Sequence, residues 1–267
     1  MSFFKQRTLS TGVLIVGFLF TCSIMLPVVG LNKPNAIDLP SRLLSPSSSH
    51  FFGTDGFGRD IFARCLYAVR LDLFVCAVIT FVPMIFGVVA GSISGYFGGW
   101  FDTIMSRFIE MLLAFPFLIL VIAVVAISGP GLTGVFVAVL AIGWTLYARI
   151  SRAEMLVIRD QEFVLAAKTL GFSTTRIIFR HAIPSLLRSN VVFSMSDFVS
   201  NLLLLAGLSY LGLGVQAPTA ELGSMIAEGQ QYLSQAWWIA VVPGAIVVLL
   251  GSGLSMIGDG LADRMTV

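Results

Sequence analysis

Long stretches of apolar residues, separated by short polar segments, constrain this chain more than any other feature. A helix needs about 20 mostly apolar residues to cross the hydrocarbon core of a bilayer. Only 11% of the 267 residues are charged, whereas soluble domains carry roughly 25%. We therefore predict an all-α polytopic membrane protein with six transmembrane helices, at 9–30, 72–96, 103–128, 132–149, 190–213 and 237–258.

The lysines and arginines predict which side of the membrane each end faces. Seven of the 16 lie in one polar segment, at Arg149, Arg152, Arg159, Lys168, Arg176, Arg180 and Arg188. Because cytoplasmic loops carry an excess of Lys and Arg, we expect this segment and both termini to lie in the cytoplasm. The first stretch, 9–30, is longer than the roughly 7–15 residues of a signal-peptide core, so we interpret it as an uncleaved span.

The segment 31–71 follows the first span and is predicted to lie outside. Its Pro- and Ser-rich part leads into a turn-rich run from His50 to Asp60, followed by an amphipathic helix that ends near Arg70. Asp60 and Arg64 are spaced as an ion pair on one helix face. This helix either lies on the membrane as an elbow or contacts an external partner. We therefore divide the chain into 1–71, the first span with its external elbow segment, and 72–267, a five-helix core.

The fifth apolar stretch carries polar side chains at helical spacing. Ser194, Asp197, Ser200 and Asn201 recur three and four residues apart, so they share one helix face. An ionisable group inside a span normally faces a bundle interior or a wet cavity. Two interpretations stay open: these residues line a translocation path, or they form hydrogen bonds between helices.

No catalytic constellation is evident in the sequence. A phosphate-binding loop needs Gly-Lys-Ser/Thr, and the three lysines follow Phe4, Asn32 and Ala167 instead. Neither the three cysteines nor the two histidines have the spacing of a metal site, so no metal or cofactor is expected on this chain. The net charge of +2 does not favour nucleic-acid binding. An intramembrane protease or a transferase is the remaining enzymatic alternative.

The polar segment between the fourth and fifth spans, about 150–189, has the pattern of two short helices. Good helix formers run from Arg159 to Leu170, with an apolar stripe at Phe163, Ala166, Ala167 and Leu170. Gly171 suits the position after a helix end, and Ser173 suits the N-cap of a second helix at 174–182. Pro184 is expected to end that helix and redirect the chain. The segment is either a docking surface or a solvated loop that contacts nothing.

Several motifs resemble one family of membrane proteins. The pattern Glu162, Ala166, Ala167 and Gly171, followed by Pro184, resembles the EAA loop of ABC importer permeases. Further motifs in the same order resemble the dipeptide, oligopeptide and nickel branch, at Gly53–Asp60, Gly95–Trp100, Leu211–Val215, Ala217–Gly223 and Gly258–Gly260. The resemblance covers residues 33 to 261. Leu222 stands where the family usually has Trp, and Ala262 where it usually has Arg.

The resemblance implies an inner-membrane permease subunit that imports di- or oligopeptides, or nickel or a metal chelate, with ATP used by partner subunits. The implied partners are a second, similar permease, two ABC ATPases and an external substrate-binding protein. Glu162, Ala166, Ala167, Gly171 and Pro184 match the motif that couples such permeases to their ATPases. The alternative of another class is a channel or structural membrane protein without ATP coupling.

Overall fold

The structure is a computed structural model, and it describes residues 2–28 and 33–265. Within these ranges the chain is almost entirely helical and contains no strand. Thr54 and Asp60 form an isolated β-bridge. The helices are α1 Ser2–Val28, α2 Ile61–Phe97, α3 Gly99–Leu113, α4 Phe117–Ser128, α5 Leu132–Ile142, α6 Trp144–Ile158, α7 Glu162–Thr169, α8 Thr174–Arg176, α9 Ile183–Tyr210, α10 Leu222–Gln230 and α11 Trp238–Met265. Short 3₁₀ and π-helical segments occupy Leu39–Ser41 and Ile177–Ala182.

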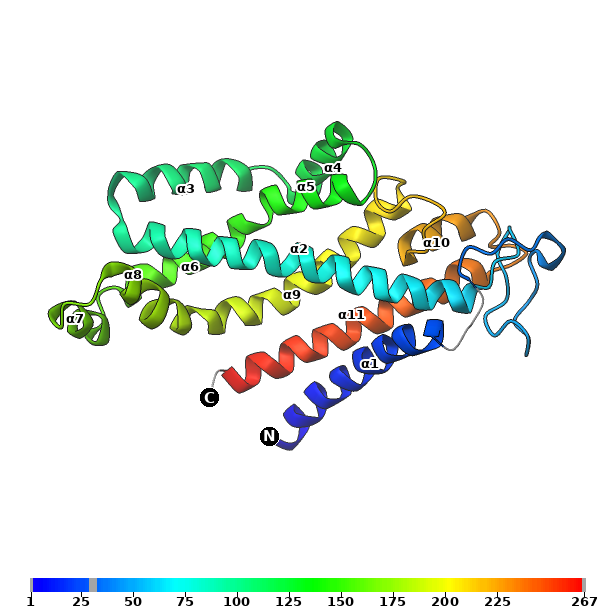
Figure 1. Ribbon diagram of the computed structural model, residues 1–267, viewed down its shortest axis with the longest axis horizontal. Helices are drawn as coiled ribbons and strands as arrows, with labels where there is room; N and C mark the ends of the chain where they lie inside the picture. The colour runs from blue at the N-terminus through cyan, green and yellow to red at the C-terminus, as the bar shows by residue number, and fades with distance from the viewer. Residues whose placement is uncertain (1, 29–32, 266–267) are drawn as a thin grey trace.

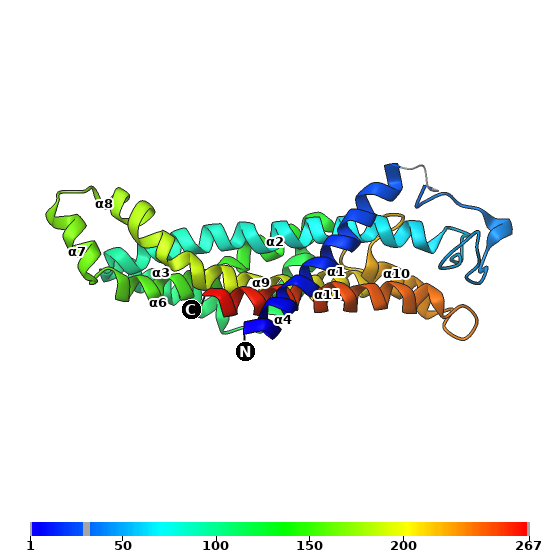
Figure 2. The same cartoon turned by 90° about the horizontal axis from the view of Figure 1, so that it is seen from below.

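The helices form an elongated bundle (Figure 1). α2 and α9 run along its length, with α3, α4 and α5 on one side and α1 and α11 on the other. Residues 159–182, which include α7 and α8, make up one end, called here the α7 end. Residues 33–60 and 214–237, which include α10, make up the opposite end, called the α10 end. The N-terminal end of α1 and the C-terminal end of α11 lie close together in both views (Figures 1 and 2).

Length and composition identify five helical segments of the described chain that are able to cross a membrane, at Arg7–Met25, Ile61–Phe97, Leu132–Ile158, Thr174–Tyr210 and Trp238–Arg264. A sixth span arises if α3 and α4 are counted together, although they meet at 86°. The prediction of an all-α polytopic protein is therefore confirmed, with five or six spans.

The break between α3 and α4 lies inside a stretch predicted as one span, 103–128. Pro116 occupies the position before α4 and has no N–H to donate to the preceding turn. Its ring also disfavours a helical conformation for the residue before it, Phe115. The apolar composition predicted the length of this region but not its bend of 86°.

The start of α2 differs from the sequence prediction. The expected surface helix ending at Arg70 is wrong, because these residues form the first turns of a continuous helix, Ile61–Phe97. The boundary predicted between residues 71 and 72 falls inside this helix. Asp60 fixes its beginning by accepting a hydrogen bond from the N–H of Ala63 at 2.9 Å. At about 1.5 Å per residue the 37 residues measure about 55 Å, well beyond the roughly 30 Å of a hydrocarbon core.

Small residues allow α2 to approach α6 closely. Gly87, Gly91 and Gly95 face α6, and a β-carbon on any of them would collide with its backbone or its Cβ atoms. For Gly91 the obstructing group is the carbonyl of Ala148. Gly12 of α1 and Gly253 of α11 likewise permit close contact between those two helices. Close packing through glycine is common between membrane helices, and here it fixes α2 along the centre of the bundle.

Candidate functional site

A cavity of about 590 Å³ lies among α2, α4, α5, α6 and α9, with mostly apolar walls. Three of the four residues predicted for a translocation path line it, namely Asp197, Ser200 and Asn201. Ser194 does not line it; this residue is fully buried, and its hydroxyl donates to the carbonyl of Val191 at 2.8 Å. Ser196 also lines the cavity. Its spacing of four residues from Ser200 was the signal that could have identified it.

Asp197 is held within a set of hydrogen bonds that joins three helices. Its Oδ2 accepts from the hydroxyl of Tyr147 in α6 at 2.8 Å and from Nδ2 of Asn201 at 3.1 Å. The same amide nitrogen contacts Oγ1 of Thr80 in α2 at 2.9 Å. Both interpretations of this polar face therefore agree with the geometry: the carboxyl lines a cavity and also connects helices. Such partners reduce the cost of placing an ionisable group within a bundle.

The local structure of the α7 end agrees closely with its sequence pattern. α7 begins at Glu162, and Gly171 follows its end with φ of 76°. Ser173 caps α8, because its hydroxyl accepts from the N–H of Arg176 at 3.4 Å. The predicted pair of short helices joined by a glycine is thus confirmed.

Pro184 does not act as predicted. The expected helix end at this residue is wrong, because the chain passes from α8 through the π-helical segment Ile177–Ala182 directly into α9. Pro184 lies in the first turn of α9, a position that tolerates proline because its missing N–H is not needed there. The π-helical segment lies immediately before α9, where Pro184 cannot donate to Arg180.

Burial divides the predicted stripe of α7 into two faces. Ala167 is only 4% exposed and packs, together with Val164, in a small apolar cluster. Phe163, Ala166 and Leu170 remain exposed, with Phe163 at 42% and Leu170 at 73%. Glu162 and Gly171 are also exposed. The prediction that these four residues form one stripe is therefore wrong for Ala167, which packs inward beside Val164 while the other three are exposed. The other members of this cluster are Met155, Ile158, Ile177, Ile178, Ala182 and Leu186.

Basic residues of α6 and of the α7 end contact the end of α2 and the start of α3. Arg152 forms a bidentate pair with Asp102, at 2.5 and 2.6 Å, and Asp102 also accepts from the hydroxyl of Ser94 at 2.7 Å. Arg159 donates to the carbonyl of Gly95 at 3.0 Å. The ammonium of Lys168 lies 5.2 Å from the ring centre of Tyr96. These side chains brace the segment against the bundle in addition to providing positive charge.

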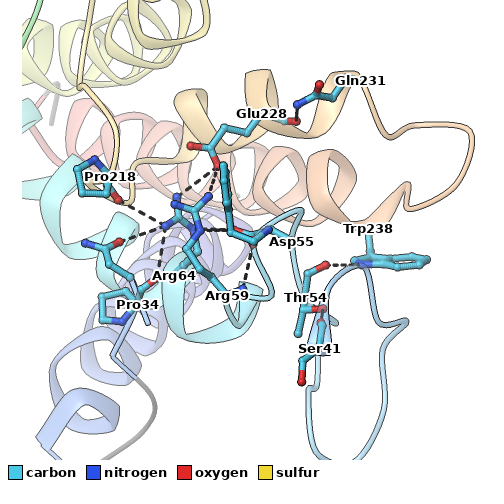
Figure 3. A network of polar contacts seen from close by, with 12 residues as sticks. Pro34, Ser41, Thr54, Asp55, Arg59, Arg64, Pro218, Glu228, Gln231 and Trp238 are labelled. Atoms are coloured by element: carbon cyan, nitrogen blue, oxygen red, sulfur yellow. Dashed lines mark hydrogen bonds and ion pairs between the residues drawn. The ribbon is translucent and has the colours of Figure 1, made fainter. Parts of the chain in front are cut away.

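At the α10 end, charged side chains meet inside the structure (Figure 3). Arg59 contacts Asp55 and Glu228, each at 2.6 Å, and is itself buried. Arg64 is 1% exposed and lies 3.7 Å from Asp55 and 3.5 Å from Glu228. These four residues, Asp55, Arg59, Arg64 and Glu228, form what we call the outer charge cluster.

Arg64 also reaches backbone and side-chain oxygens from two further segments. Its Nη1 donates to the carbonyl of Pro34 at 3.3 Å, to Oδ1 of Asn35 at 3.1 Å and to the carbonyl of Pro218 at 3.5 Å. The predicted pair of Asp60 with Arg64 is not among its contacts. Asp60 instead caps α2 and lies 2.8 Å from Nδ1 of His50. Arg64 thus joins the segment after α1, the start of α2 and the segment before α10.

Glu221 caps α10 from a fully buried position. Its carboxyl accepts from the N–H groups of Gly223 and Ser224 at 2.9 and 2.7 Å. Burial raises the pKa of this carboxyl above its usual range, and the two N–H donors oppose that rise. The sequence analysis did not identify this residue as a helix cap.

No group of three or more His, Cys, Asp or Glu side chains in residues 2–28 and 33–265 is arranged to hold a metal ion.

Comparisons with known proteins identify membrane components of transport systems as relatives of this chain. A family model described as "Binding-protein-dependent transport system inner membrane component" matches residues 87–267. The dipeptide transport system permease protein DppC of Alkalihalophilus pseudofirmus is 37% identical over 261 residues, which cover 98% of this chain and 86% of that protein. The oligopeptide transport system permease protein OppC of Bacillus subtilis is 34% identical over 265 residues, covering 99% and 87%.

A probable D,D-dipeptide transport system permease protein of Escherichia coli, DdpC, is 36% identical over 255 residues, covering 96% of this chain and 86% of that protein. Among solved structures, the MetNI methionine ABC transporter in an inward-facing conformation matches with a TM-score of 0.58 and 17% identity. That match covers 76% of this chain and 97% of the other, and it shows a shared fold.

Proposed function

Because the chain belongs to the family of binding-protein-dependent transport system inner membrane components, we propose that it is the permease subunit of an ATP-driven importer of di- or oligopeptides. It is a multi-pass protein of the inner membrane and belongs to a class of subunits that is generally not catalytic. The three relatives described above are named for dipeptide or oligopeptide transport, which supports peptides as the cargo. The family match to residues 87–267 supports a permease core that contains this range, and α2, which begins at Ile61, joins it as one continuous helix.

The α7 end is proposed to face the cytoplasm and to contact an ABC ATPase. The excess of Lys and Arg in this segment favours that side. The observation that carries the proposal is the division of α7 into two faces. Val164 and Ala167 anchor it to the bundle, while Phe163, Ala166 and Leu170 present apolar surface outward. A short helix anchored on one face and bare on the other is suited to receive a partner.

Motion of the ATPases would then pass to the spans through rigid contacts. The Arg159–Gly95 hydrogen bond connects the α7 end to α2, and the Arg152–Asp102 pair connects the preceding helix, α6, to α3. α2 and α9 both contribute to the cavity that contains Asp197. Displacement of α7 would reorient those helices around the cavity, which is alternating access by movement of packed elements. In this scheme Asp197, Ser200 and Asn201 line half of the path.

The proposal assigns four further components to the transporter. A second permease of the same family completes the path, two ATPase subunits bind and hydrolyse ATP, and an external binding protein delivers the peptide. Among the coupling residues Glu162, Ala166 and Gly171 face outward. Ala167 and Pro184 act by shaping the segment, since Ala167 packs inward and Pro184 begins α9.

Two adjacent alanines provide the test of coupling. Ala166→Asp places a charge on the exposed face and should leave the thermal unfolding temperature unchanged, while abolishing peptide uptake and ATPase co-purification. Ala167→Asp buries an unpaired charge and should lower stability by several kcal/mol. Uptake would be measured in proteoliposomes containing the full transporter and its binding protein. Normal uptake by Ala166→Asp, with normal ATPase co-purification, would contradict the coupling role.

Cargo is tested with the same proteoliposomes. Labelled dipeptide and ⁶³Ni²⁺ would be offered in parallel, each with and without the external binding protein. We expect ATP-dependent accumulation of the dipeptide alone. Accumulation of nickel would replace the peptide assignment, and passage of either solute without ATP would indicate a channel.

A further inference from the structure

A groove on the α1 side of the bundle has apolar walls and a cation at its rim. Its volume is about 940 Å³, and it lies between α1 and α2 near the α10 end. Phe20 and Ile24 of α1 form one wall, and Leu71, Phe74 and Ala77 of α2 form the other. The groove lies on the opposite side of α2 from α4 and α5 (Figure 1), which border the cavity containing Asp197. It is therefore separate from the proposed translocation path.

The exposed face of α2 changes from charged to apolar at this groove. Arg70 is exposed, and Phe74, one turn farther along, is 65% exposed. Val82 and Ile85 continue the exposed apolar surface toward the middle of the molecule. A cation directly followed by apolar surface is typical of the boundary between headgroups and hydrocarbon. Arg70 thus lies at the level where lipid phosphates are expected.

The rim of the groove is suited to an anion. Arg70 forms no ion pair within residues 2–28 and 33–265, and no residue that lines the groove is acidic. Asn35 also lines it, and its Oδ1 accepts from Arg64 at 3.1 Å. The amide Nδ2 of Asn35 is therefore left to donate to a ligand. A headgroup that carries an ammonium would find no carboxylate to pair with there.

We propose that this groove binds a phospholipid of net negative charge. An acyl chain lies along Phe74 and Ala77 against Phe20 and Ile24, and the headgroup phosphate accepts hydrogen bonds from Arg70 and Asn35. Burial of acyl methylene groups supplies most of the binding free energy, and the charge of Arg70 supplies selectivity. The lipid connects α1 to α2 and, through Asn35, to the outer charge cluster.

The test uses the full chain, purified with the subunits that accompany it, in nanodiscs. Trace phosphatidylglycerol with a diazirine in its acyl chain is activated by light, and the labelled peptides are mapped by mass spectrometry. Phosphatidylcholine with the same acyl chains is the matched probe. We expect labelling between residues 67 and 77, about fivefold stronger with phosphatidylglycerol, as one arginine near an anionic lipid would give.

Two kinds of variant separate the charged rim from the apolar groove. Arg70→Gln should reduce labelling by phosphatidylglycerol to the level of phosphatidylcholine, whereas Arg42→Gln, an exposed external cation outside the groove, should change nothing. Ala77→Trp fills the groove and should reduce labelling by both lipids. If a variant fails to fold, the unaltered protein provides the test instead. Excess unlabelled phosphatidylglycerol should then compete with the labelled lipid and reduce labelling between residues 67 and 77.

Three results would overturn the proposal. The first is equal labelling by the two lipids, and the second is labelling that Arg70→Gln leaves unchanged. The third comes from p-benzoylphenylalanine placed at residue 74, which reports the occupant directly. Cross-linking of that residue to another protein subunit would show that the groove is a subunit interface.

Discussion

The two ends of the molecule are stabilised by opposite means. At the α10 end, the outer charge cluster pairs two buried arginines with two carboxylates, and Arg64 is 1% exposed. At the α7 end, a small apolar cluster holds α7, while Phe163, Ala166 and Leu170 remain uncovered. The first end pairs its buried arginines with carboxylates of the same chain, whereas the second leaves apolar surface uncovered within residues 2–28 and 33–265.

This difference indicates where a permanent partner is needed. Buried ion pairs hold a fixed geometry because breaking one leaves an uncompensated charge. Exposed apolar surface on a short helix is instead stabilised by contact with another molecule. The α7 end is thus suited to a lasting interface, and the α10 end is suited to keeping its own shape without one.

Removal of Arg64 should have the largest effect. Arg64→Ala leaves Asp55 and Glu228 with one cation and deprives the carbonyls of Pro34 and Pro218 of a donor. We expect a loss of about 3–5 kcal/mol in stability, measured as a lower unfolding temperature in detergent. Arg107→Ala is the matched control, because that side chain is 80% exposed in its pair with Glu110. Equal effects of the two variants would show that the outer charge cluster is not a stabilising feature.

A smaller effect is expected where α6 joins α3, close to the α7 end. Arg152→Ala removes a bidentate pair with Asp102 and should cost about 1.5–3 kcal/mol, as for hydrogen bonds to charged groups. In the proposed coupling scheme this pair transmits movement from α7, so we expect uptake to be lost even where the variant stays folded. A double-mutant cycle with Asp102→Ala measures the coupling. Full additivity of the two substitutions would mean that the contact contributes nothing.

Gly171 should show a conformational effect of modest size. Its φ of 76° is left-handed, and a β-carbon there would meet no other atom within 4 Å. Gly171→Ala should therefore cost about 1–2 kcal/mol from backbone strain alone, with Gly171→Asn costing less, since Asn tolerates this conformation. Gly171→Asp should in addition abolish uptake by placing a charge beside the exposed face of α7. Equal stability of the Ala and Asn variants would contradict the strain argument.

The smallest expected effect is a pH dependence at the α10 end. Burial raises the pKa of the Glu221 carboxyl, so the folded protein binds this proton more tightly than the unfolded chain. Its contribution is present below the unfolded pKa of about 4.3 and is lost as the pH rises through the higher folded value. The unfolding temperature should therefore fall from acidic to neutral pH more steeply than in Glu221→Gln. Parallel curves would exclude this carboxyl as the cause.

Features that depend on local sequence were predictable. Apolar length indicated the spans, Gly171 and Ser173 located the ends of two short helices, and the spacing of Asp197 with Asn201 identified a face that lines a cavity. Each of these depends on residues within a few turns of one another. Local pattern also indicated the family, because its motifs are contiguous.

Features that depend on distant partners were not predictable. Arg64 is four residues from Asp60, and local spacing favoured that pair. The Arg64 side chain instead contacts residues far away in the sequence, among them Pro218, which is 154 positions away. The inward position of Ala167 depends on α9 and the end of α6. The 86° bend at Pro116 depends on where α4 can pack, since many membrane helices contain proline without breaking. A single sequence contains no direct measure of these contacts.

The ion pair between Arg59 and Glu228 sets an order of events during biosynthesis. The two residues are 169 positions apart, and ribosomes add roughly 5–20 residues per second. About 10 to 30 seconds therefore separate the synthesis of the arginine from that of its second carboxylate. During that interval Asp55 is the sole acidic member of the cluster beside Arg59 and Arg64. The outer charge cluster is consequently completed late, and a nascent chain arrested before α10 would carry these three residues with a net positive charge.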